Sequence, residues 1–188
     1  MRKLKLQMHI SIDGFVSATG SESSNFKWDD EIRKYSVANL GQVDYVLLGS
    51  KTAPAFIPHW ASVAANPNDP DYPVGKLLTD IPKIIFSKKT TKSELSNAKM
   101  ENGDLVDEIK KLKKEKGNDM IVYGGVDFVS SLISNQLIDE YHLLVNPVAL
   151  GSGMPVFKQR TNLKLVKATP FSCGIVIVKY EPSKKQSK

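Results

Sequence analysis

The stretch that decides the fold is Met120-Ile-Val-Tyr-Gly-Gly-Val-Asp-Phe-Val-Ser-Ser-Leu-Ile133. It begins with an apolar run typical of a buried strand, passes through two glycines, and continues with apolar residues at helical spacing. Glycines at such a junction let the backbone approach a ligand closely, and the helix that follows directs free N–H groups at an anion. The stretch therefore predicts a strand-turn-helix unit in which Gly124 and Gly125 form either a phosphate site or a tight structural turn. It lacks the Gly-x-Gly-x-x-Gly fingerprint, which argues against a Rossmann fold.

Two more predicted strands end in residue types that suit phosphate. These residues are Gly49, Ser50, Lys51 and Thr52 after the strand predicted at 43–48, and Ser87 and Lys88 at the end of the strand predicted at 83–87. Lysine supplies a point charge, hydroxyls donate to phosphate oxygens, and glycine removes a Cβ that would block a close approach. For the first group, a polar helix start is the alternative interpretation. Because ligands of open α/β sheets bind beyond the carboxyl ends of strands, the three ends favour one extended dinucleotide site.

Apolar periodicity predicts a single α/β domain over residues 1–181, followed by a disordered tail at 182–188. The remaining strands are predicted at 4–12, 140–145, 164–168 and 174–180, and helices at 31–40, 108–116 and about 127–134. The proline-rich stretch 54–73 is predicted to be largely loop around a short helical piece near Trp60.

The composition excludes several classes of protein. Of the 188 residues, 41% are hydrophobic and 24% charged, which is the ordinary globular range rather than that of a collagen-like or disordered chain. The apolar runs are too short for a membrane-spanning helix, and the N-terminus lacks the apolar core of a signal peptide, so we expect a cytoplasmic protein. A single cysteine, Cys173, can form neither an internal disulfide nor a thiolate zinc cluster. We expect no metal site and assign Cys173 to packing.

The net charge of +6 raises the question of a nucleic-acid partner. Much of the excess lies in the C-terminal tail and in the stretch 108–116, where Ile109 and Leu112 recur at helical spacing among lysines. These stretches contain no interleaved aromatic residues for base stacking, so we interpret them as solvated surface and expect no nucleic-acid partner.

Five motifs, in order along nearly the whole chain, resemble the dihydrofolate reductase-like family. They are Ser11-Ile-Asp-Gly14, Leu48-Gly-Ser-Lys-Thr52, Phe86-Ser-Lys88, Val122-Tyr-Gly-Gly125 and the stretch from Leu137 to Phe157. Within the family, the chain resembles the reductase domain of the bifunctional riboflavin-biosynthesis deaminase/reductase, and Phe56-Ile-Pro-His-Trp60 is similar to its small stand-alone members. The resemblance implies a central, mixed and mostly parallel sheet flanked by helices, and an NADPH-dependent reductase. It also implies a homodimer paired through the C-terminal strands.

The resemblance assigns individual residues to the cofactor. It places Gly49, Ser50, Lys51 and Thr52 at the pyrophosphate, Ser87 and Lys88 at the adenosine 2′-phosphate, and Gly124, Gly125 and Val126 beneath the pyrophosphate and the nicotinamide ribose. Asp13 and Gly14 match the point where the first strand meets nicotinamide and substrate. The family usually has arginine where this chain has Ser50, so a bidentate phosphate contact is lost, although Lys51 could partly replace its charge.

Asp13 is the candidate catalytic residue, as a proton donor, and its alternative role is that of a turn aspartate beside Gly14. Asp29 and Asp30 are further candidates, for which we favour helix capping. We assign no catalytic role to His9, His59 or His142.

Two sequence features could belong to the substrate side. Trp28 and Trp60 could wall a flat heterocycle or pack in the core. Gly151-Ser-Gly153 could be a substrate-side loop, which in the riboflavin enzymes lies near the ribose phosphate, or a hairpin connection, which we favour.

The leading hypothesis is an NADPH-dependent reductase of a small heterocyclic substrate, resembling 5-amino-6-(5-phosphoribosylamino)uracil reductase. Such a site positions the hydride donor against an electrophilic C=N or C=O carbon. The sequence contains no deaminase with histidine and cysteine zinc ligands, so we expect this chain alone not to perform both riboflavin steps. One alternative is dihydrofolate reduction, which calls for an acidic residue on the first helix, Asp30 or Glu31. Another is a non-catalytic nucleotide-binding protein that keeps the fold.

Overall fold

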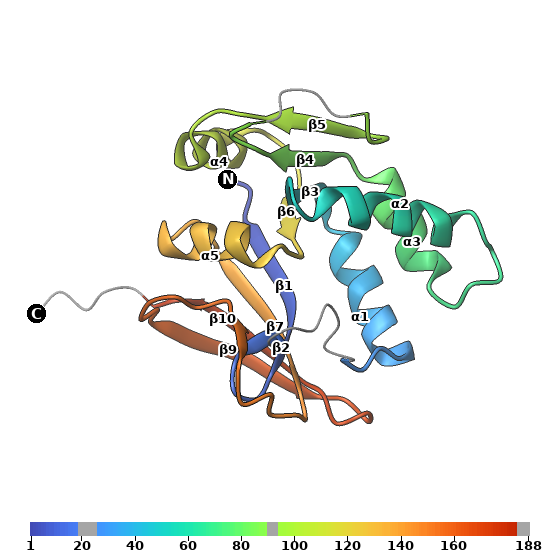
Figure 1. Cartoon of the computed structure of the whole chain (residues 1–188), viewed down its shortest axis with the longest axis vertical. Coiled ribbons are helices and arrows are strands. Elements are labelled where there is room, and N and C mark those ends of the chain that lie inside the picture. The colour runs from blue at the N-terminus through green and yellow to red at the C-terminus, as the bar shows by residue number, and fades with distance from the viewer. Residues whose placement is uncertain (19–25, 90–93, 184–188) are drawn as a thin grey trace, which may run out of the picture.

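The computed structural model describes residues 1–18, 26–89 and 94–183, which form an α/β fold around one large sheet (Figure 1). The sheet has eight strands in the order β5-β4-β3-β6-β1-β7-β10-β9. Their bounds are β1 Leu4–Ser11, β3 Val43–Gly49, β4 Lys83–Phe86, β5 Ala98–Glu101, β6 Asp119–Val122, β7 Glu140–Asn146, β9 Leu163–Pro170 and β10 Val176–Pro182. The strands from β5 to β7 pair in parallel, whereas β10 pairs antiparallel with both β7 and β9. The mixed, mostly parallel sheet expected from the resemblance is thus confirmed.

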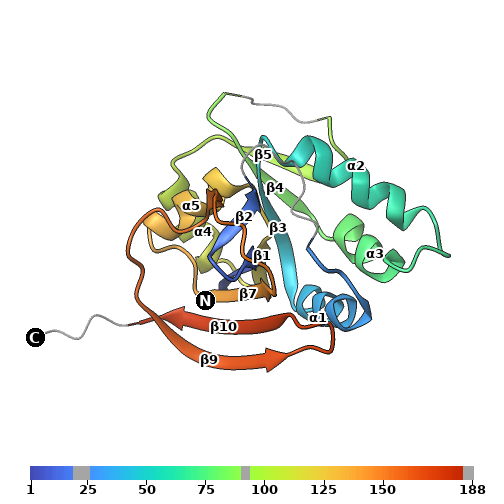
Figure 2. The same cartoon turned by 60° about the horizontal axis from the view of Figure 1, so that its bottom comes forward.

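Helices cover the two faces of the sheet. On one face lie α1 Asp30–Leu40, α2 Ala53–Ala64 and α3 Tyr72–Asp80, and on the other lie α4 Leu105–Lys114 and α5 Val126–Ser134 (Figures 1 and 2). A separate antiparallel ribbon joins β2 Phe15–Ala18 to β8 Gly153–Pro155. Because successive side chains of a strand point to opposite faces, Val46 and Leu48 pack under α1–α3 while Leu47 packs under α4 and α5. Each of these fully buried side chains contributes about 1.5–3 kcal/mol of hydrophobic stabilisation.

Helix α1 begins directly after its capping residue, Asp29. Asp29 has an extended backbone, and its Oδ1 accepts a hydrogen bond from the backbone N–H of Ile32 at 3.0 Å. Asp30 follows in the first turn, with an 84% exposed side chain that pairs with Arg33. Both aspartates therefore have the helix-start roles that Asp residues favour.

The proline-rich stretch forms two helices, so the prediction of loop over most of 54–73 was wrong. Pro54 lies in the first turn of α2 and Pro73 in that of α3, where the missing N–H group costs nothing and the fixed φ suits a helix. Only Pro58 interrupts a helix interior. Burial of Ile57 against the core shared with α3 offsets the lost hydrogen bond.

The other predicted strands and helices are present, with ends shifted by up to three residues. Three short strands, β2, β5 and β8, were not predicted. The basic helix α4 exposes most of its lysines, but Lys113 is buried, and its Nζ pairs with Asp139 at 2.5 Å and donates to the Leu137 carbonyl at 2.7 Å. The predicted tail lies outside the described residues from 184 onward, while Pro182 still belongs to β10.

Within the part of the chain that the structure describes, no helix has the length and apolar character needed to cross a bilayer. Over the same residues, no three His, Cys, Asp or Glu side chains gather where they could bind a metal ion.

We expect Gly75→Ala to destabilise the fold, because α2 and α3 pack closely at this glycine. An added Cβ would lie 2.7 Å from Val63 Cγ1 and 3.1 Å from the Ala64 backbone nitrogen. Overpacking costs about 1–3 kcal/mol, which outweighs the gain of about 0.5–1 kcal/mol in helix propensity. Urea denaturation should show a net loss of about 1 kcal/mol. The control is Lys76→Ala on the exposed side of the same helix, and an unchanged midpoint for Gly75→Ala would contradict the close packing.

Candidate functional site

Parallel pairing brings the predicted site residues to one edge of the sheet. The carboxyl ends of β4, β3, β6, β1 and β7 are neighbours in that order. The turn after β3 contacts β4 through the Ser50 N–H group, which donates to the Phe86 carbonyl at 3.1 Å. It also contacts the turn after β6, because a Cβ at Gly125 would lie only 2.4 Å from Thr52 Oγ1. The structure thus places the three phosphate-suited strand ends side by side.

Two helices begin at this edge without a side-chain cap. The N-cap of α2 is Thr52, whose side chain makes no capping hydrogen bond, and that of α5 is Gly125, which has no side chain to cap the helix. Unsatisfied N–H groups and the positive end of the helix dipole attract anions. Nothing lies within 4 Å of the position of a Cβ on Gly124, so the backbone between β6 and α5 is open to a ligand.

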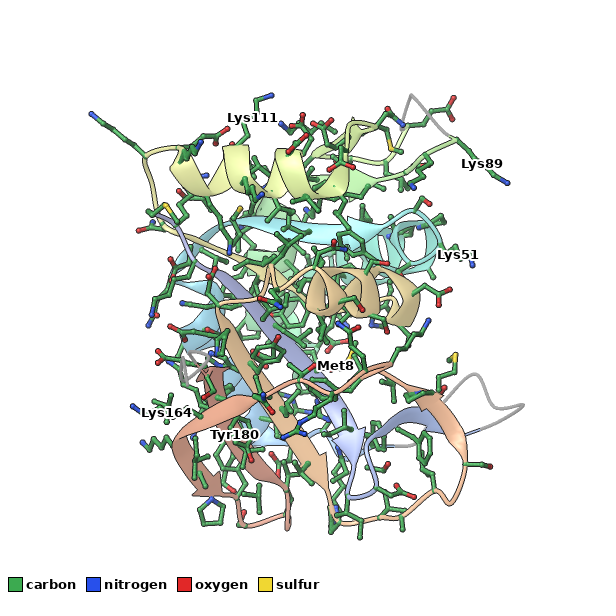
Figure 3. All side chains as sticks on the ribbon, turned by 90° about the vertical axis from the view of Figure 1, so that its left-hand side faces the viewer. Met8, Lys51, Lys89, Lys111, Lys164 and Tyr180 are labelled. Atoms are coloured by element: carbon green, nitrogen blue, oxygen red, sulfur yellow. The ribbon has the colours of Figure 1, made fainter. Side chains whose placement is uncertain are left out.

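Lysines surround this turn, and one carboxylate already pairs with two of them. Asp127, in the first turn of α5, accepts from Lys158 Nζ at 3.0 Å and from Lys51 Nζ at 3.5 Å. These two lysines, Lys158 more than Lys51, lower the pKa of Asp127. The Lys51 side chain is 89% exposed and points away from the molecule (Figure 3), and Lys88 is exposed at the end of β4. Both can reorient toward a phosphate.

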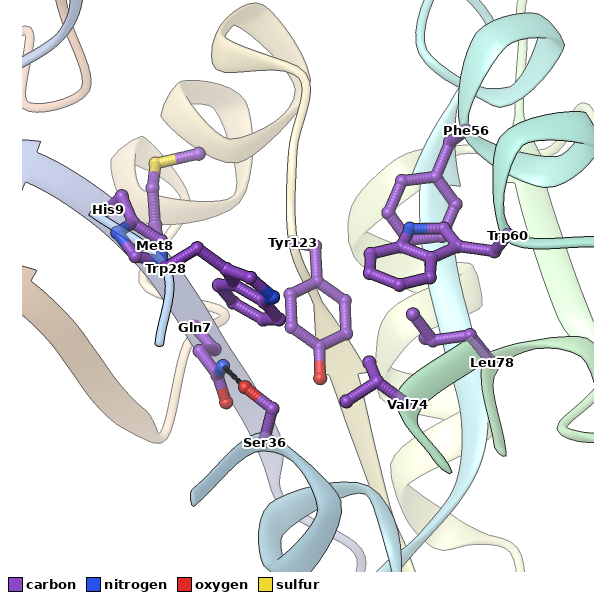
Figure 4. Close-up of a pocket in the computed structure, with 10 residues that line it drawn as sticks. All are labelled: Gln7, Met8, His9, Trp28, Ser36, Phe56, Trp60, Val74, Leu78 and Tyr123. Atoms are coloured by element: carbon purple, nitrogen blue, oxygen red, sulfur yellow. Dashed lines mark hydrogen bonds between the residues drawn. The ribbon is translucent and has the colours of Figure 1, made fainter. Parts of the chain in front are cut away.

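A cavity lies next to the glycine turn, on the α1–α3 face of the sheet. Its inner part has a volume of about 110 Å³ and is lined by the side chains drawn in Figure 4, and a second, outer part of about 350 Å³ shares some of that lining. The two parts share four lining residues, which are Met8, His9, Trp28 and Tyr123. Since Tyr123 directly precedes Gly124, the phosphate-suited turn and the cavity are adjacent.

Aromatic side chains make most of the wall of the inner cavity. The ring centroids of Trp28 and Trp60 are 6.5 Å apart, and those of Phe56 and Tyr123 are 6.1 Å apart. Trp28 is held in place because its Nε1 donates to Asp71 Oδ1 at 2.7 Å, and Arg33 also pairs with this carboxylate. Both tryptophans line the cavity and also pack on the core, so the two roles foreseen for them coexist.

The polar part of the lining is a neutral network. Gln7 Nε2 donates to Ser36 Oγ at 2.9 Å, drawn as the dashed line in Figure 4. Asn39 Nδ2 donates to Gln7 Oε1 at 2.8 Å. Gln7 is thereby fixed, and no charged side chain is among the described residues that line the inner cavity.

Asp13 lies at the end of β1, where it anchors a loop. Its carboxylate accepts hydrogen bonds from Ser11 Oγ at 2.5 Å, from the Leu150 N–H at 3.1 Å and from the Gly151 N–H at 2.7 Å. The Ser11 hydroxyl, followed by the backbone N–H groups of Gly151 and Leu150, lowers the pKa of Asp13. The carboxyl group therefore carries no proton near neutral pH, and these contacts fit the turn role better than that of a proton donor.

The sequence assigns no role in a cavity to Met8, His9, Phe56 or Tyr123, although Phe56 and Tyr123 stand in motifs that carry the resemblance. In the sequence, Tyr123 stands as the last residue of the apolar run that precedes the glycines. Its position directly before Gly124 was the available signal, because a residue that precedes a ligand-binding turn lies at the same sheet edge.

A mostly parallel sheet with these features at one edge is that of a dihydrofolate reductase-like domain, and solved structures of that class superpose on the protein. A putative riboflavin biosynthesis protein from Shewanella sp. PV-4 does so with a TM-score of 0.72 and 18% identity, covering 98% of this chain and 100% of that one. RibD from Acinetobacter baumannii also gives a TM-score of 0.72, with 14% identity over 97% of this chain and 58% of that longer one. At these identities the likeness shows the fold alone.

Residues 2–177 match the family described as the RibD C-terminal domain, and the chain belongs to this family. A relative with similar sequence is the uncharacterized protein YyaP of Bacillus subtilis (strain 168). It is 33% identical over 185 residues, which cover 95% of this chain and 94% of the relative. The chain spans about three fifths of the length of the RibD structure from Acinetobacter baumannii, 58% of that protein.

We expect Asp13→Asn to loosen the loop that Asp13 anchors. The amide group carries no charge and presents one acceptor oxygen in place of two, so the N–H groups of Leu150 and Gly151 lose charge-assisted hydrogen bonds. Hydrogen exchange followed by mass spectrometry should show faster exchange in peptides that cover 148–153. Peptides from β7 serve as the internal control. Unchanged exchange in both regions would contradict the anchoring role.

Proposed function

We propose that this protein is an NADPH-dependent reductase of a small heterocyclic substrate, with a reaction similar to that of 5-amino-6-(5-phosphoribosylamino)uracil reductase. The observation that carries the proposal is the continuity of Tyr123, Gly124 and Gly125. This short segment joins an anion-suited turn to an aromatic cavity. A dinucleotide with its pyrophosphate at the turn would place its nicotinamide at the mouth of the cavity.

The described residues fit such a cofactor. The open space at Gly124 leaves the backbone N–H groups at the start of α5 accessible to the pyrophosphate. The start of α2 offers fewer, because Pro54 has no N–H group and the Ala55 N–H donates to the Thr52 carbonyl at 3.2 Å. The turn after β4, with Ser87 and Lys88, would lie at the adenosine 2′-phosphate, two strands away from β6. When bound, NADPH supplies the hydride.

The protein's own side chains would orient the substrate and exclude water. Trp28 and Trp60 can stack against a flat ring, and the fixed Gln7 amide lines the same space. Among the described residues, no carboxyl group lines either part of the cavity. A proton for the reduced substrate would therefore come from a group other than a carboxyl, or from water.

The dihydrofolate reductase alternative is less well supported by this lining. It calls for an acidic residue of α1 that faces the substrate. Asp30 pairs with Arg33 at the surface, and Glu31 Oε2 accepts from the Ser172 N–H at 2.7 Å and from Ser172 Oγ at 2.5 Å. Neither residue lines the cavity. The other alternative is a protein that binds a nucleotide but catalyses no reaction.

The expected homodimer also stays a proposal. Leu165 and Val166 on the edge strand β9 are 52% and 48% exposed. A contact through the C-terminal strands would cover these apolar side chains.

Binding of NADPH tests the proposed function, and Gly124 offers a sharp variant. Gly124→Asp adds a carboxylate where a phosphate would lie, with no steric conflict in the free protein. Like charges about 4 Å apart repel by about 4 kcal/mol at an effective dielectric constant of about 20. Fluorescence titration should therefore show that the variant binds NADPH about 10–1,000-fold more weakly than the wild type.

Two controls separate charge from shape in this experiment. Gly124→Ala adds a Cβ without charge and should bind NADPH like the wild type. Lys88→Ala should weaken NADPH more than NADH, since only NADPH carries the 2′-phosphate. If the wild type binds neither nucleotide at millimolar concentration, the cofactor assignment is wrong.

Ser50→Arg should strengthen NADPH binding. Ser50 is partly exposed at the start of the pyrophosphate turn, and an arginine there could form a bidentate contact with phosphate. A charge-assisted hydrogen bond contributes about 1.5–3 kcal/mol, so a gain of about tenfold or more in affinity is expected. Ser50→Gln is the control of similar reach without charge. Equal affinities for Ser50→Arg and Ser50→Gln would place the phosphate elsewhere.

A further inference from the structure

A groove lies between helix α1 and the C-terminal strands, apart from the aromatic cavity. It has a volume of about 240 Å³, and none of the described residues that line it also lines the cavity. The lining comes from α1, β7, β9 and β10, and Figure 2 shows α1 beside the hairpin of β9 and β10. Gln42 before β3 and His142 near the start of β7 place the groove toward the amino ends of the parallel strands. The proposed nucleotide site lies beyond the opposite ends.

Two lysines of this lining are directly opposite each other. Lys167 on β9 and Lys179 on β10 are partners in the antiparallel register. Like charges in directly opposite positions destabilise a sheet. Lys179 Nζ pairs with Glu140 at 2.6 Å, but this carboxylate also pairs with Lys3 Nζ at 2.6 Å. Lys167 is exposed, and within the described part of the chain no ion pair neutralises its charge.

The buried side chains next to the lysines hold one another in place. Burial acts to raise the pKa of Glu140, but hydrogen bonds from Lys179 and Lys3 lower it to about 2, so the group is ionised. An ionised carboxylate only accepts hydrogen bonds, so His142 Nε2, which lies 3.2 Å from Glu140 Oε2, carries the proton. His142 Nδ1 then accepts from the Tyr35 hydroxyl at 2.5 Å. Glu140 thus already has three donors, and Lys167 is not one of them.

Uncharged donors complete the lining of the groove. Gln42 Oε1 accepts from Lys5 Nζ at 3.3 Å, so the amide NH₂ is the group that Gln42 can offer to a ligand. Thr169 lies two residues from Lys167 on the same face of β9, and its hydroxyl can donate as well. Among the described residues, no carboxyl group lines the groove. Two cations beside amide and hydroxyl donors favour an anion.

The charge and the size of the groove fit a phosphoryl group. A phosphate monoester carries a charge of about −1.5 to −2 near neutral pH and has three strong acceptor oxygens. Two lysines and two uncharged donors match this charge and these acceptors. A cavity of about 150 Å³ in another protein holds benzene, so the groove volume of about 240 Å³ also leaves space for a small organic substituent.

From these observations we propose that the groove is a second binding site, which takes inorganic phosphate or a small phosphate monoester, and that Lys167 and Lys179 bind the phosphoryl oxygens. The bound anion weakens the repulsion between the two lysines, while Lys179 keeps its contact with Glu140. The site does not depend on NADPH, because it shares no described residue with the glycine turn or the aromatic cavity.

Isothermal titration calorimetry in a buffer without phosphate tests this site. The protein is the full chain with Gly124→Asp, whose added carboxylate blocks the competing phosphate site at the glycine turn. The probes are inorganic phosphate and glycerol 3-phosphate, with glycerol as the uncharged control. We expect phosphoryl binding that Lys167→Ala weakens about tenfold or more, the effect of one charge-assisted hydrogen bond. Lys164→Ala, on the same strand but outside the groove, is the matched control and should bind normally.

Thermal unfolding separates binding from a structural role of Lys167. In the free protein, Lys167→Ala removes a repulsion between like charges, so its melting temperature should equal or exceed that of the parent protein. Added phosphate should raise the melting temperature of the parent protein and of Lys164→Ala, but not that of Lys167→Ala.

Three results would overturn the proposal. The first is that neither phosphoryl probe binds at millimolar concentration. The second is an equal loss of binding in Lys164→Ala and Lys167→Ala, which would indicate general attraction to a basic surface. The third is a dimer that Lys167→Ala dissociates in light scattering without any phosphate binding, which would assign the lysines to a contact with a second copy. NADPH should bind the wild type and the single variant Lys167→Ala equally, so the proposed function and this site can fail separately.

Discussion

The position of β1 between β6 and β7 is the constraint on which the site depends. β1 pairs in parallel with β6 from Leu4↔Met120 and with β7 through to Ser11↔Asn146, so strands far apart in sequence end at one edge. Side chains alternate along a strand, and a slip of one residue would turn His9 from the cavity to the opposite face. Two carboxylates hold the start of the strand: Asp119 accepts from the Lys3 N–H and Asp139 from the Leu4 N–H, each at 2.8 Å.

The parts of the fold that the sequence predicted are those with short-range signals. The apolar run at 43–48 predicts a strand and the glycine pair at 124–125 predicts a turn, each from a few neighbouring residues. The proline-rich stretch carried a local signal for loop that packing overrode, since Ile57 and Val74 gain more by burial in a shared core than the prolines lose. That gain depends on contacts between two helices and the sheet, which a local pattern does not contain.

The candidate site likewise has one half with local sequence signals and one half that depends on long-range contacts. Its phosphate half consists of contiguous motifs, and each can be interpreted where it stands in the chain. The cavity collects residues from β1, from the segment before α1, from the helices α1, α2 and α3, and from the residue that follows β6. Its chemistry depends on partners that are remote in sequence. The hydrogen-bond partner of His9 Nδ1 is Asn146 Nδ2 at 3.3 Å, which lies 137 positions away in the sequence. Asp13 was noticed for its place beside Gly14, but only the structure shows that it binds the loop at Gly151.

The two ends of the sheet differ in how well their buried polar and charged groups are paired, and this difference bears on function. At the amino ends of the strands, buried charges are paired: Glu140 contacts Lys3 and Lys179, each at 2.6 Å, and Lys5 pairs with Asp119 at 3.1 Å. At the carboxyl ends, two helices start without side-chain caps, and His9 Nε2 and Tyr123 Oη at the cavity have no hydrogen-bond partner among the described residues. Such deficits reduce stability and persist where ligand binding compensates for them. Because both kinds of deficit meet at the segment from Tyr123 to Gly125, one extended ligand, or a cofactor and a substrate in contact, would satisfy them together.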